Sequence, residues 1–127
     1  MVHLLDTNVI IRFLIGDDRA LFDKAQTIFK QIEAGELAVV IMESVLMEAL
    51  FVLTKFYDID RREASDDLKQ ILSLAFVCNP DKPQLTEALT LFAHKNIDFV
   101  DALLCARKRY ENKGILSFDR DIKRCDG

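Results

Sequence analysis

Short apolar runs alternate along the chain with longer stretches whose apolar residues recur at helical spacing. Val2–Leu5 is an apolar run that ends abruptly at Asp6, a pattern that predicts a buried strand. Three similar runs predict further strands at Leu37–Ile41, Ala75–Cys78 and Ile115–Phe118. Because helical stretches separate these runs, the sequence predicts an α/β fold, a three-layer α/β/α sandwich with a mostly parallel central sheet.

Capping and turn residues mark the ends of the predicted helices. Either Asp17 or Asp18 can cap the second helix, and Asp60 with Glu63 three residues later resembles a capping box. The predicted helices run from Asp6 to Gly16, from Asp17 or Asp18 to Gly35, from about Ser44 to Tyr57, from Asp60 through Leu72, from Pro80–Pro83 through Phe92, and from Asp98 to about Asn112. With only four Gly and two Pro in 127 residues, loops should be short, and residues 1–127 are expected to form a single domain.

The apolar content suits a packed core and not a membrane span. Half of the residues are hydrophobic, yet the densest runs, Ala38–Met42 and Ala49–Leu53, are far too short to cross a bilayer. No secretory signal pattern opens the sequence. The three cysteines lack metal-site spacing, and Cys78 and Cys105 lie among apolar residues, which is typical of small buried hydrophobes. We therefore expect a cytoplasmic protein in a reducing compartment.

The acidic balance of the chain narrows the possible partners. A net charge of −4 argues against broad coating of nucleic acid, which needs a basic face. It does not argue against a nuclease, because a site built from carboxylates adds negative charge until cations fill it. The basic cluster formed by Arg107, Lys108, Arg109 and Lys113 lies near a predicted helix C-terminus, where cations are favoured without any further function.

Four acidic residues stand among apolar neighbours in the sequence, namely Asp6, Glu48, Asp101 and Asp119. A carboxylate taken out of water without a partner costs several kcal/mol, so such residues need a cation, hydrogen-bond donors or a proton. In the predicted topology Asp6 and Asp119 each end a strand, and the other two begin helices at the same sheet edge. Open α/β sheets bind their ligands there. Four carboxylates without His or Cys form an oxygen-only site that suits Mg²⁺ or Mn²⁺.

Two of the four carboxylates have a structural alternative. Asp6 can cap the helix that follows it, although Thr7 or Asn8 could cap instead. Glu48 can form an ion pair, with Lys55 or Arg12 as the partner. Thr7 and Ser117 can hydrogen-bond the Asp6 carboxylate or a water, and a plain turn role suits Ser117 equally well.

The other two carboxylates compete with close neighbours for the ligand role. Asp98 is placed as the helix N-cap and Asp101 at the third helical position, where the helix alone can satisfy it. The apolar flanks favour Asp101. Asp119 directly follows a predicted strand, whereas Asp121 is better placed to cap or begin a final helix.

The motifs around these carboxylates resemble the PIN-domain family, and within it the VapC-type toxins of toxin–antitoxin pairs. The resemblance spans nearly the whole chain, and its motifs are Leu5-Asp6-Thr7-Asn8, Glu48, Phe99-Val100-Asp101-Ala102-Leu103 and Ser117-Phe118-Asp119. Met42 departs from it, because relatives often have Ser or Thr there. The resemblance implies a metal-dependent ribonuclease with RNA as substrate, a homodimer, and a small antitoxin protein that occludes the acidic cleft.

Other readings of a strand-end aspartate fit the chain less well. A haloacid-dehalogenase-type phosphatase needs a second Asp where Asn8 stands, and a receiver domain needs adjacent acids at the first strand end. A catalytically inactive PIN-like interaction module and a housekeeping PIN nuclease are the remaining alternatives. The intact set of four carboxylates argues against the inactive module, and metal-dependent cleavage of RNA by pure protein would separate the readings.

Overall fold

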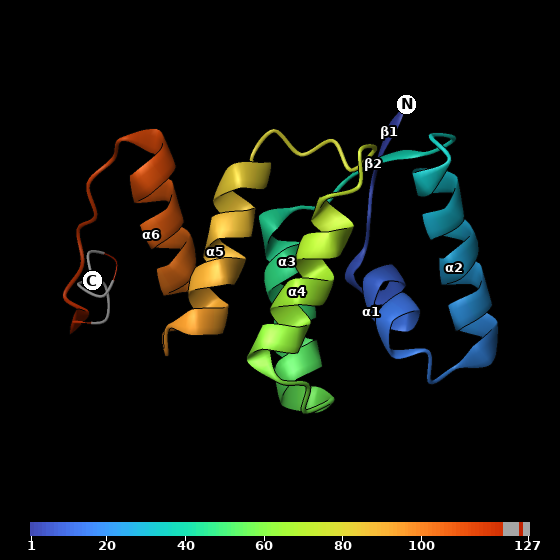
Figure 1. Ribbon diagram of the computed structural model, residues 1–127, viewed down its shortest axis with the longest axis horizontal. Coiled ribbons are helices and arrows are strands. Elements are labelled where there is room, and N and C mark those ends of the chain that lie inside the picture. The colour runs from blue at the N-terminus through green and yellow to red at the C-terminus, as the bar shows by residue number, and fades with distance from the viewer. Residues whose placement is uncertain (121–124, 126–127) are drawn as a thin grey trace. The chain divides into compact units, whose positions relative to one another are not determined.

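The computed structural model describes residues 1–120 and residue 125. The chain divides into two compact units, Met1–Pro80 and Asp81–Gly127 (Figure 1). The elements are β1 (Val2–Leu4), α1 (Thr7–Ile15), α2 (Arg19–Glu33), β2 (Ala38–Val40), α3 (Glu43–Phe51), the π-helical turn η1 (Val52–Phe56), α4 (Arg61–Leu72), α5 (Lys82–His94) and α6 (Phe99–Glu111).

The first unit contains a parallel sheet. Strand β1 pairs in parallel with β2, so that Leu4 lies opposite Val40, and Val77 adds a single parallel bridge to Val39 where a third strand was predicted. The predicted α/β fold with a parallel sheet is confirmed. The prediction that β1 is buried is wrong, because Val2 and Leu4 are 55% and 71% exposed. Among the described residues β1 pairs with β2 on one side only, as an edge strand does.

Predicted capping residues begin and end the helices of the first unit. Asp18, not Asp17, is the N-cap of α2 and accepts a hydrogen bond from the Leu21 amide at 3.1 Å. Asp60 caps α4 through the Arg62 amide. Gly16 ends α1 with φ +68°, a left-handed conformation that glycine adopts without a steric penalty.

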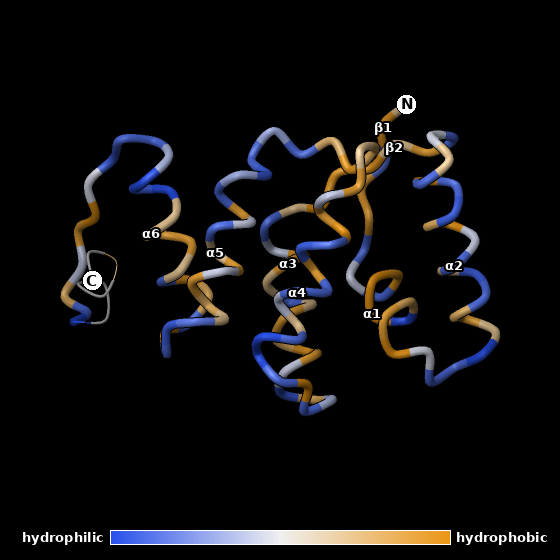
Figure 2. The backbone as a smooth tube through the Cα atoms, viewed as in Figure 1, coloured by the Kyte–Doolittle hydropathy of each residue, from blue (hydrophilic) through white to orange (hydrophobic). Residues whose placement is uncertain are grey.

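The core of the first unit lies between its helices and β2. Helix α1 packs against α2 and α3, and α3 packs against α4. Figure 2 shows that α1 is apolar over most of its length, whereas α2 and α4 alternate between hydrophilic and hydrophobic positions. This core is formed by fully buried side chains that include Ile10, Phe29, Ile32, Val39, Ile41, Leu46, Leu50, Leu53, Leu68 and Leu72.

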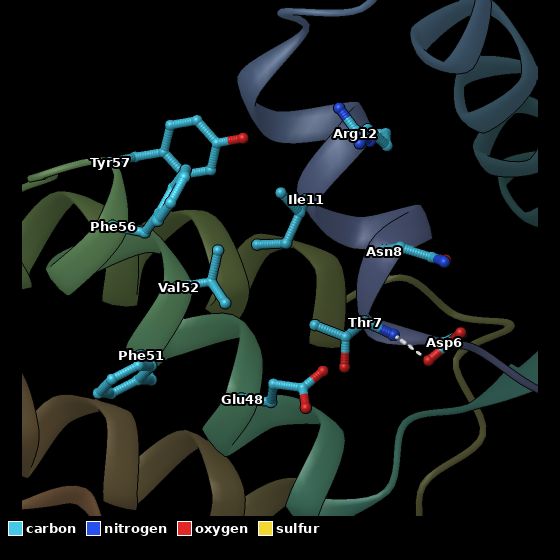
Figure 3. Close-up of a pocket in the computed structure, with 10 residues that line it drawn as sticks. All are labelled: Asp6, Thr7, Asn8, Ile11, Arg12, Glu48, Phe51, Val52, Phe56 and Tyr57. Atoms are coloured by element: carbon cyan, nitrogen blue, oxygen red, sulfur yellow. Dashed lines mark hydrogen bonds between the residues drawn. The ribbon is translucent and has the colours of Figure 1, made fainter.

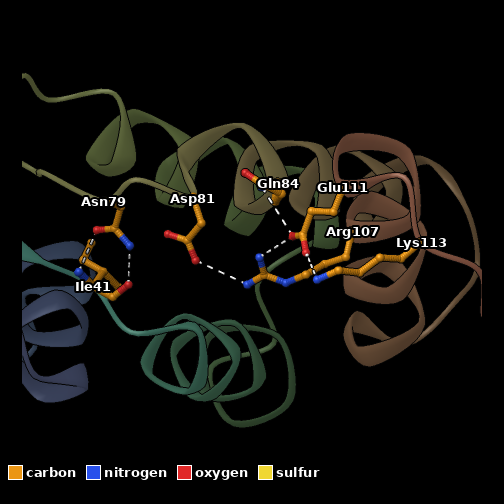
Figure 4. Close-up of polar contacts among 7 residues, drawn as sticks. All are labelled: Ile41, Asn79, Asp81, Gln84, Arg107, Glu111 and Lys113. Carbon is orange, nitrogen blue, oxygen red and sulfur yellow. Dashed lines mark hydrogen bonds and ion pairs between the residues drawn. The ribbon is translucent and has the colours of Figure 1, made fainter.

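The side chain of Asn79 continues the backbone pairing beyond the end of β2. Its Oδ1 accepts a hydrogen bond from the Ile41 amide at 2.8 Å, and its Nδ2 donates to the Ile41 carbonyl at 2.7 Å (Figure 4). Asn79 is 7% exposed, so both hydrogen bonds are shielded from water. The residue therefore fixes the chain directly before α3, the helix that carries Glu48.

Helix α3 begins without a side-chain cap. Its N-cap is Met42, whose backbone is extended and whose thioether accepts no capping hydrogen bond. A hydroxyl or carboxylate at this position satisfies one of the free amides of the first helical turn, which contributes about 0.5–2 kcal/mol. We expect Met42→Thr to raise the free energy of unfolding by about 1 kcal/mol, measured by urea denaturation. The variant Met42→Leu should show no such gain, and an equal gain for both would contradict the capping explanation.

The second unit contains α5 packed against α6. The inward positions of α5 are buried as predicted, with Leu85 and Leu89 fully so. Residues 115–118, predicted as a strand, have no strand pairing among the described residues. Leu116 and Phe118 in this segment are fully exposed. The apolar run therefore predicted a strand that does not form among the described residues.

Ion pairs occupy the basic cluster at the end of α6, where the sequence predicted only that a helix C-terminus favours cations. Arg107 contacts Glu111 at 2.8 Å and Asp81 at 3.3 Å, and Lys113 contacts Glu111 at 2.8 Å (Figure 4). Arg109 contacts Glu87 at 2.9 Å. The hydrogen bonds from Lys113 and then Arg107 lower the pKa of Glu111 from 4.5 to about 2.

The lowered pKa of Glu111 gives a pH-dependent prediction. A carboxylate whose pKa is depressed by folding stabilises the protein above its ordinary pKa, and this contribution is lost as the pH falls toward 2. We expect an NMR titration to place the Glu111 midpoint near 2 and Lys113→Met to raise it toward 4.5. The variant Lys108→Met should leave the midpoint in place. A normal midpoint in the unmodified protein would contradict the prediction.

The cysteines differ from their predicted roles. Cys105 is buried as expected, but it forms a disulfide with Cys125 across a Cα–Cα distance of 5.3 Å. Cys78 is a free thiol and is exposed, so its interpretation as a buried hydrophobe is wrong. None of the helices in the described residues is long and apolar enough to span a membrane.

Candidate functional site

A single pocket in the first unit brings together two of the four predicted carboxylates. It has a volume of about 430 Å³ and lies between α1 on one side and α3 with η1 on the other (Figure 3). Asp6 and Glu48 both line it. The full lining is Asp6, Thr7, Asn8, Ile11, Arg12, Glu48, Phe51, Val52, Phe56 and Tyr57.

Asp6 reaches the pocket because β1 ends directly before it and α1 begins directly after it. It is the N-cap of α1, and its Oδ1 accepts a hydrogen bond from the Thr7 amide at 2.8 Å. The capping alternative is therefore confirmed as one role of this side chain. The cap leaves the second carboxylate oxygen of Asp6 without a hydrogen bond to the described residues. Asp6 can therefore cap α1 and bind a cation at the same time.

Glu48 projects from α3 into the same pocket, and in Figure 3 its carboxylate and the Thr7 hydroxyl point toward one another. Among the described residues, Glu48 does not form the ion pair that was its predicted alternative role. Arg12 contacts Asp17 at 3.3 Å instead, and no Lys or Arg in the described part of the chain pairs with Glu48. The pocket thus contains two carboxylates that form no ion pair with a described Lys or Arg, and Arg12, which also lines it, pairs with Asp17.

The prediction that the four carboxylates lie out of water is wrong for three of them. Asp6, Glu48 and Asp119 are exposed, and only Asp101 is buried, at 8% exposure. Apolar neighbours in sequence do not surround a helical residue, because successive side chains point in different directions. Leu46, for example, is buried in the core while Glu48, two positions later on α3, faces the pocket.

The other two predicted ligands belong to the second unit. Asp101 lies in the first turn of α6, behind the N-cap Asp98, whose side chain makes no capping hydrogen bond. The amide of Asp119 donates to Ser117 Oγ at 2.9 Å, which confirms the turn role considered for Ser117. Asp121 lies outside the described residues. Across those residues, no three His, Cys, Asp or Glu side chains form a metal-binding group.

The sequence did not predict that aromatic side chains form one side of the pocket. Phe51 and Phe56 are 63% and 77% exposed, and the Tyr57 hydroxyl donates to Asp17 Oδ2 at 3.0 Å. This hydrogen bond, with some desolvation, raises the pKa of Tyr57. The available signal was the repeat of an apolar pair, Phe51-Val52 and then Phe56-Tyr57, at a spacing of five residues.

Comparison with known proteins gives a family match over most of the chain. The profile of the PIN domain matches residues 3–127. A VapC ribonuclease from Aquifex aeolicus (strain VF5) is 27% identical over 127 residues, which cover 97% of this chain and 91% of that protein. No solved structure matches the chain significantly.

Proposed function

Because the chain belongs to the PIN domain family, we propose that it is a metal-dependent endoribonuclease that hydrolyses RNA phosphodiester bonds. The observation that carries this proposal is that two carboxylates, Asp6 and Glu48, line one open pocket and form no ion pair with a described Lys or Arg. The relative whose name specifies a ribonuclease aligns over 97% of the chain and supports RNA as the substrate. We further propose that both compact units together form one nuclease domain, since the family match extends across both.

The donor set in the pocket suits a hard divalent cation. Asp6 and Glu48 supply carboxylate oxygens, Thr7 supplies a hydroxyl, and none of the lining residues is a His or Cys. Mg²⁺ and Mn²⁺ prefer such oxygen ligands. We propose that Asp6, Glu48, Asp101 and Asp119 together hold the cation. The motifs around all four carboxylates, which resemble those of the PIN-domain family, support the full set.

The structure gives Asp6 and Glu48 defined positions for the proposed reaction. When bound, a divalent cation supplies hydroxide at neutral pH and offsets the negative charge that develops on the phosphate. The Thr7 amide orients Asp6 by a hydrogen bond to one carboxylate oxygen. The position of Glu48 one turn into α3 keeps its carboxylate on the pocket side of the helix. No side-chain nucleophile is required.

Two measurements test the metal dependence. Pure protein should cleave mixed single-stranded RNA with Mg²⁺ or Mn²⁺ and lose that activity in excess EDTA. Calorimetric titration with Mn²⁺ should show binding that Glu48→Gln weakens, which is a readout independent of cleavage. Full activity in EDTA would refute the proposal.

We also propose that the protein is a cytoplasmic toxin that forms a homodimer and is inhibited by a small antitoxin. The family resemblance and the ribonuclease relative support this assignment. Large apolar side chains that stay exposed, among them Val2, Leu4 and Met47, are typical of interfaces. The antitoxin tail would be disordered when free and would present a cation to the carboxylates when bound.

Light scattering and co-expression test these partners. A monomer at high micromolar concentration would refute the homodimer. Expression of the protein alone should arrest growth, and co-expression with a small open reading frame encoded beside it should restore growth and give a complex that co-purifies. If the protein cleaves RNA but does not harm its host, a housekeeping PIN nuclease is the correct interpretation.

A further inference from the structure

The pocket that contains Asp6 and Glu48 has a second, apolar side built on an unusual stretch of helix. Helix α3 passes without a break into the π-helical turn η1, in which the Tyr57 amide donates to the Val52 carbonyl at 3.1 Å. Hydrogen bonds over five residues are rare and occur mostly as single turns, frequently at functional sites. The π-helical turn η1 thus lies beside the proposed catalytic carboxylates. The α-helical spacing of apolar residues in the sequence does not explain it.

The π-helical turn determines which aromatic side chains face the pocket. In a regular α-helix, residues five apart lie about 140° apart around the axis, so Phe51 and Phe56 would face different directions. A turn closed over five residues brings residue i+5 back over residue i. Phe51 and Phe56 consequently line the same pocket, and both remain exposed (Figure 3).

Side-chain contacts hold this aromatic side in place. The rings of Phe56 and Tyr57 meet edge to face with their centroids 4.9 Å apart. The Tyr57 hydroxyl donates to Asp17, which also pairs with Arg12 on α1. These contacts connect the end of η1, on one side of the pocket, to α1 on the other side before any ligand binds.

We propose that Phe51 and Phe56 stack an unpaired base of the RNA substrate while the adjacent phosphodiester lies at Asp6 and Glu48. This inference rests on the proposed function and adds a substrate-positioning element to it. Both groups line one continuous pocket of about 430 Å³, which is within the size range of sites that enclose ligands larger than a single ion. A base presents an uncharged π-face, so it suits the exposed rings of Phe51 and Phe56, whereas a phosphate needs the proposed metal.

The proposal specifies the form of RNA that the enzyme accepts. Stacking on aromatic side chains tolerates any base but requires that the base be splayed out of its own helix. The enzyme should therefore prefer single-stranded over double-stranded RNA and show little discrimination at the stacked position. A second protein chain on the same apolar side is the competing occupant, and the experiment below separates the two.

The test uses Asp6→Asn protein, whose cleavage should be at least about 100-fold slower than that of the unmodified protein. It is mixed with Mg²⁺ and single-stranded RNA that carries 2-aminopurine at successive positions. Stacking should quench the fluorescence at one or two adjacent positions. Phe51→Leu and Phe56→Leu, each added to this background, should remove the quenching and weaken binding about tenfold. In cleavage by the otherwise unmodified enzyme, the same substitutions should raise KM more than they lower kcat.

Phe76→Leu is the matched control, because Phe76 is a 42% exposed ring in the same unit that does not line the pocket. It should leave quenching and binding unchanged. Unchanged quenching in Phe51→Leu and Phe56→Leu would overturn the proposal, and a change only in their light-scattering mass would overturn it in favour of a protein interface. If quenching depends on both rings but the unmodified protein never cleaves RNA, base stacking stands and the proposed catalysis fails.

Discussion

Replacing Asp6 by Asn should reduce RNA cleavage at least about 100-fold, the range seen when one electrostatic element of a catalytic site is lost. The substitution removes one of the two negative charges in the pocket but keeps a side-chain oxygen at the same position, in a side chain of nearly the same size. Asn is as good an N-cap as Asp, so the hydrogen bond from the Thr7 amide should persist and α1 should remain folded. Glu48→Gln should cause a comparable loss, because it removes the other carboxylate of the pocket. Initial rates on single-stranded RNA at saturating Mn²⁺ provide the measurement.

Asp23→Asn is the matched control for the loss of a charge. Asp23 is an exposed carboxylate on α2 whose ion pair with Arg19 lies outside the pocket, and exposed pairs contribute little to stability. Its cleavage rate should stay within about twofold of the unmodified protein.

Thermal unfolding in EDTA provides a second check on the same carboxylates. Like charges that share a site repel each other when no cation is present. The melting temperature of metal-free protein should therefore rise or stay unchanged in Asp6→Asn and in Asp101→Asn. A clear fall in both variants would show that these residues stabilise the fold and would explain any loss of cleavage by unfolding.

Local signals in the sequence predicted most of the helices and the presence of Asp6 and Glu48 in one pocket. Asp18, Asp60 and Gly16 occupy helix ends because hydrogen bonding to free amides, or a positive φ, can be recognised within a few residues. Asp6 and Glu48 could be placed together because a parallel strand order aligns the ends of β1 and β2 at one edge. These inferences need only near neighbours and the direction of the strands.

Features that depend on distant contacts could not be predicted in this way. The run Ile115–Phe118 has the composition of a strand, but a strand exists only where a partner supplies hydrogen bonds. The exposure of Glu48 depends on which face of α3 the core covers, and apolar neighbours in sequence do not determine it. The π-helical turn after Phe51 also escaped prediction, because a helical pattern does not distinguish hydrogen bonds over four residues from those over five.

The role of Asn79 could not be predicted either, because nothing in its sequence context marks it. Its replacement should have the largest effect on the free energy of unfolding. Asn79→Ala removes both hydrogen bonds to Ile41 and leaves a buried amide and a buried carbonyl without these partners. Buried polar groups that lose a partner cost about 1–3 kcal/mol each, so we expect the free energy of unfolding to fall by about 2–4 kcal/mol. Urea denaturation measures this. Asn8→Ala, at an exposed position of α1, should change stability by less than about 0.5 kcal/mol.

Asn79→Asp separates the two hydrogen bonds. At pH 7 its carboxylate can still accept from the Ile41 amide, but it has no donor for the Ile41 carbonyl and places a buried charge against that oxygen. Protonation at low pH restores an O–H donor. The destabilisation of Asn79→Asp, relative to the unmodified protein at the same pH, should therefore be smaller at pH 4 than at pH 7. The destabilisation of Asn79→Ala should not change in this way, because alanine has no group to protonate. Equal pH behaviour of the two variants would show that the paired contact with Ile41 is not what holds the end of β2.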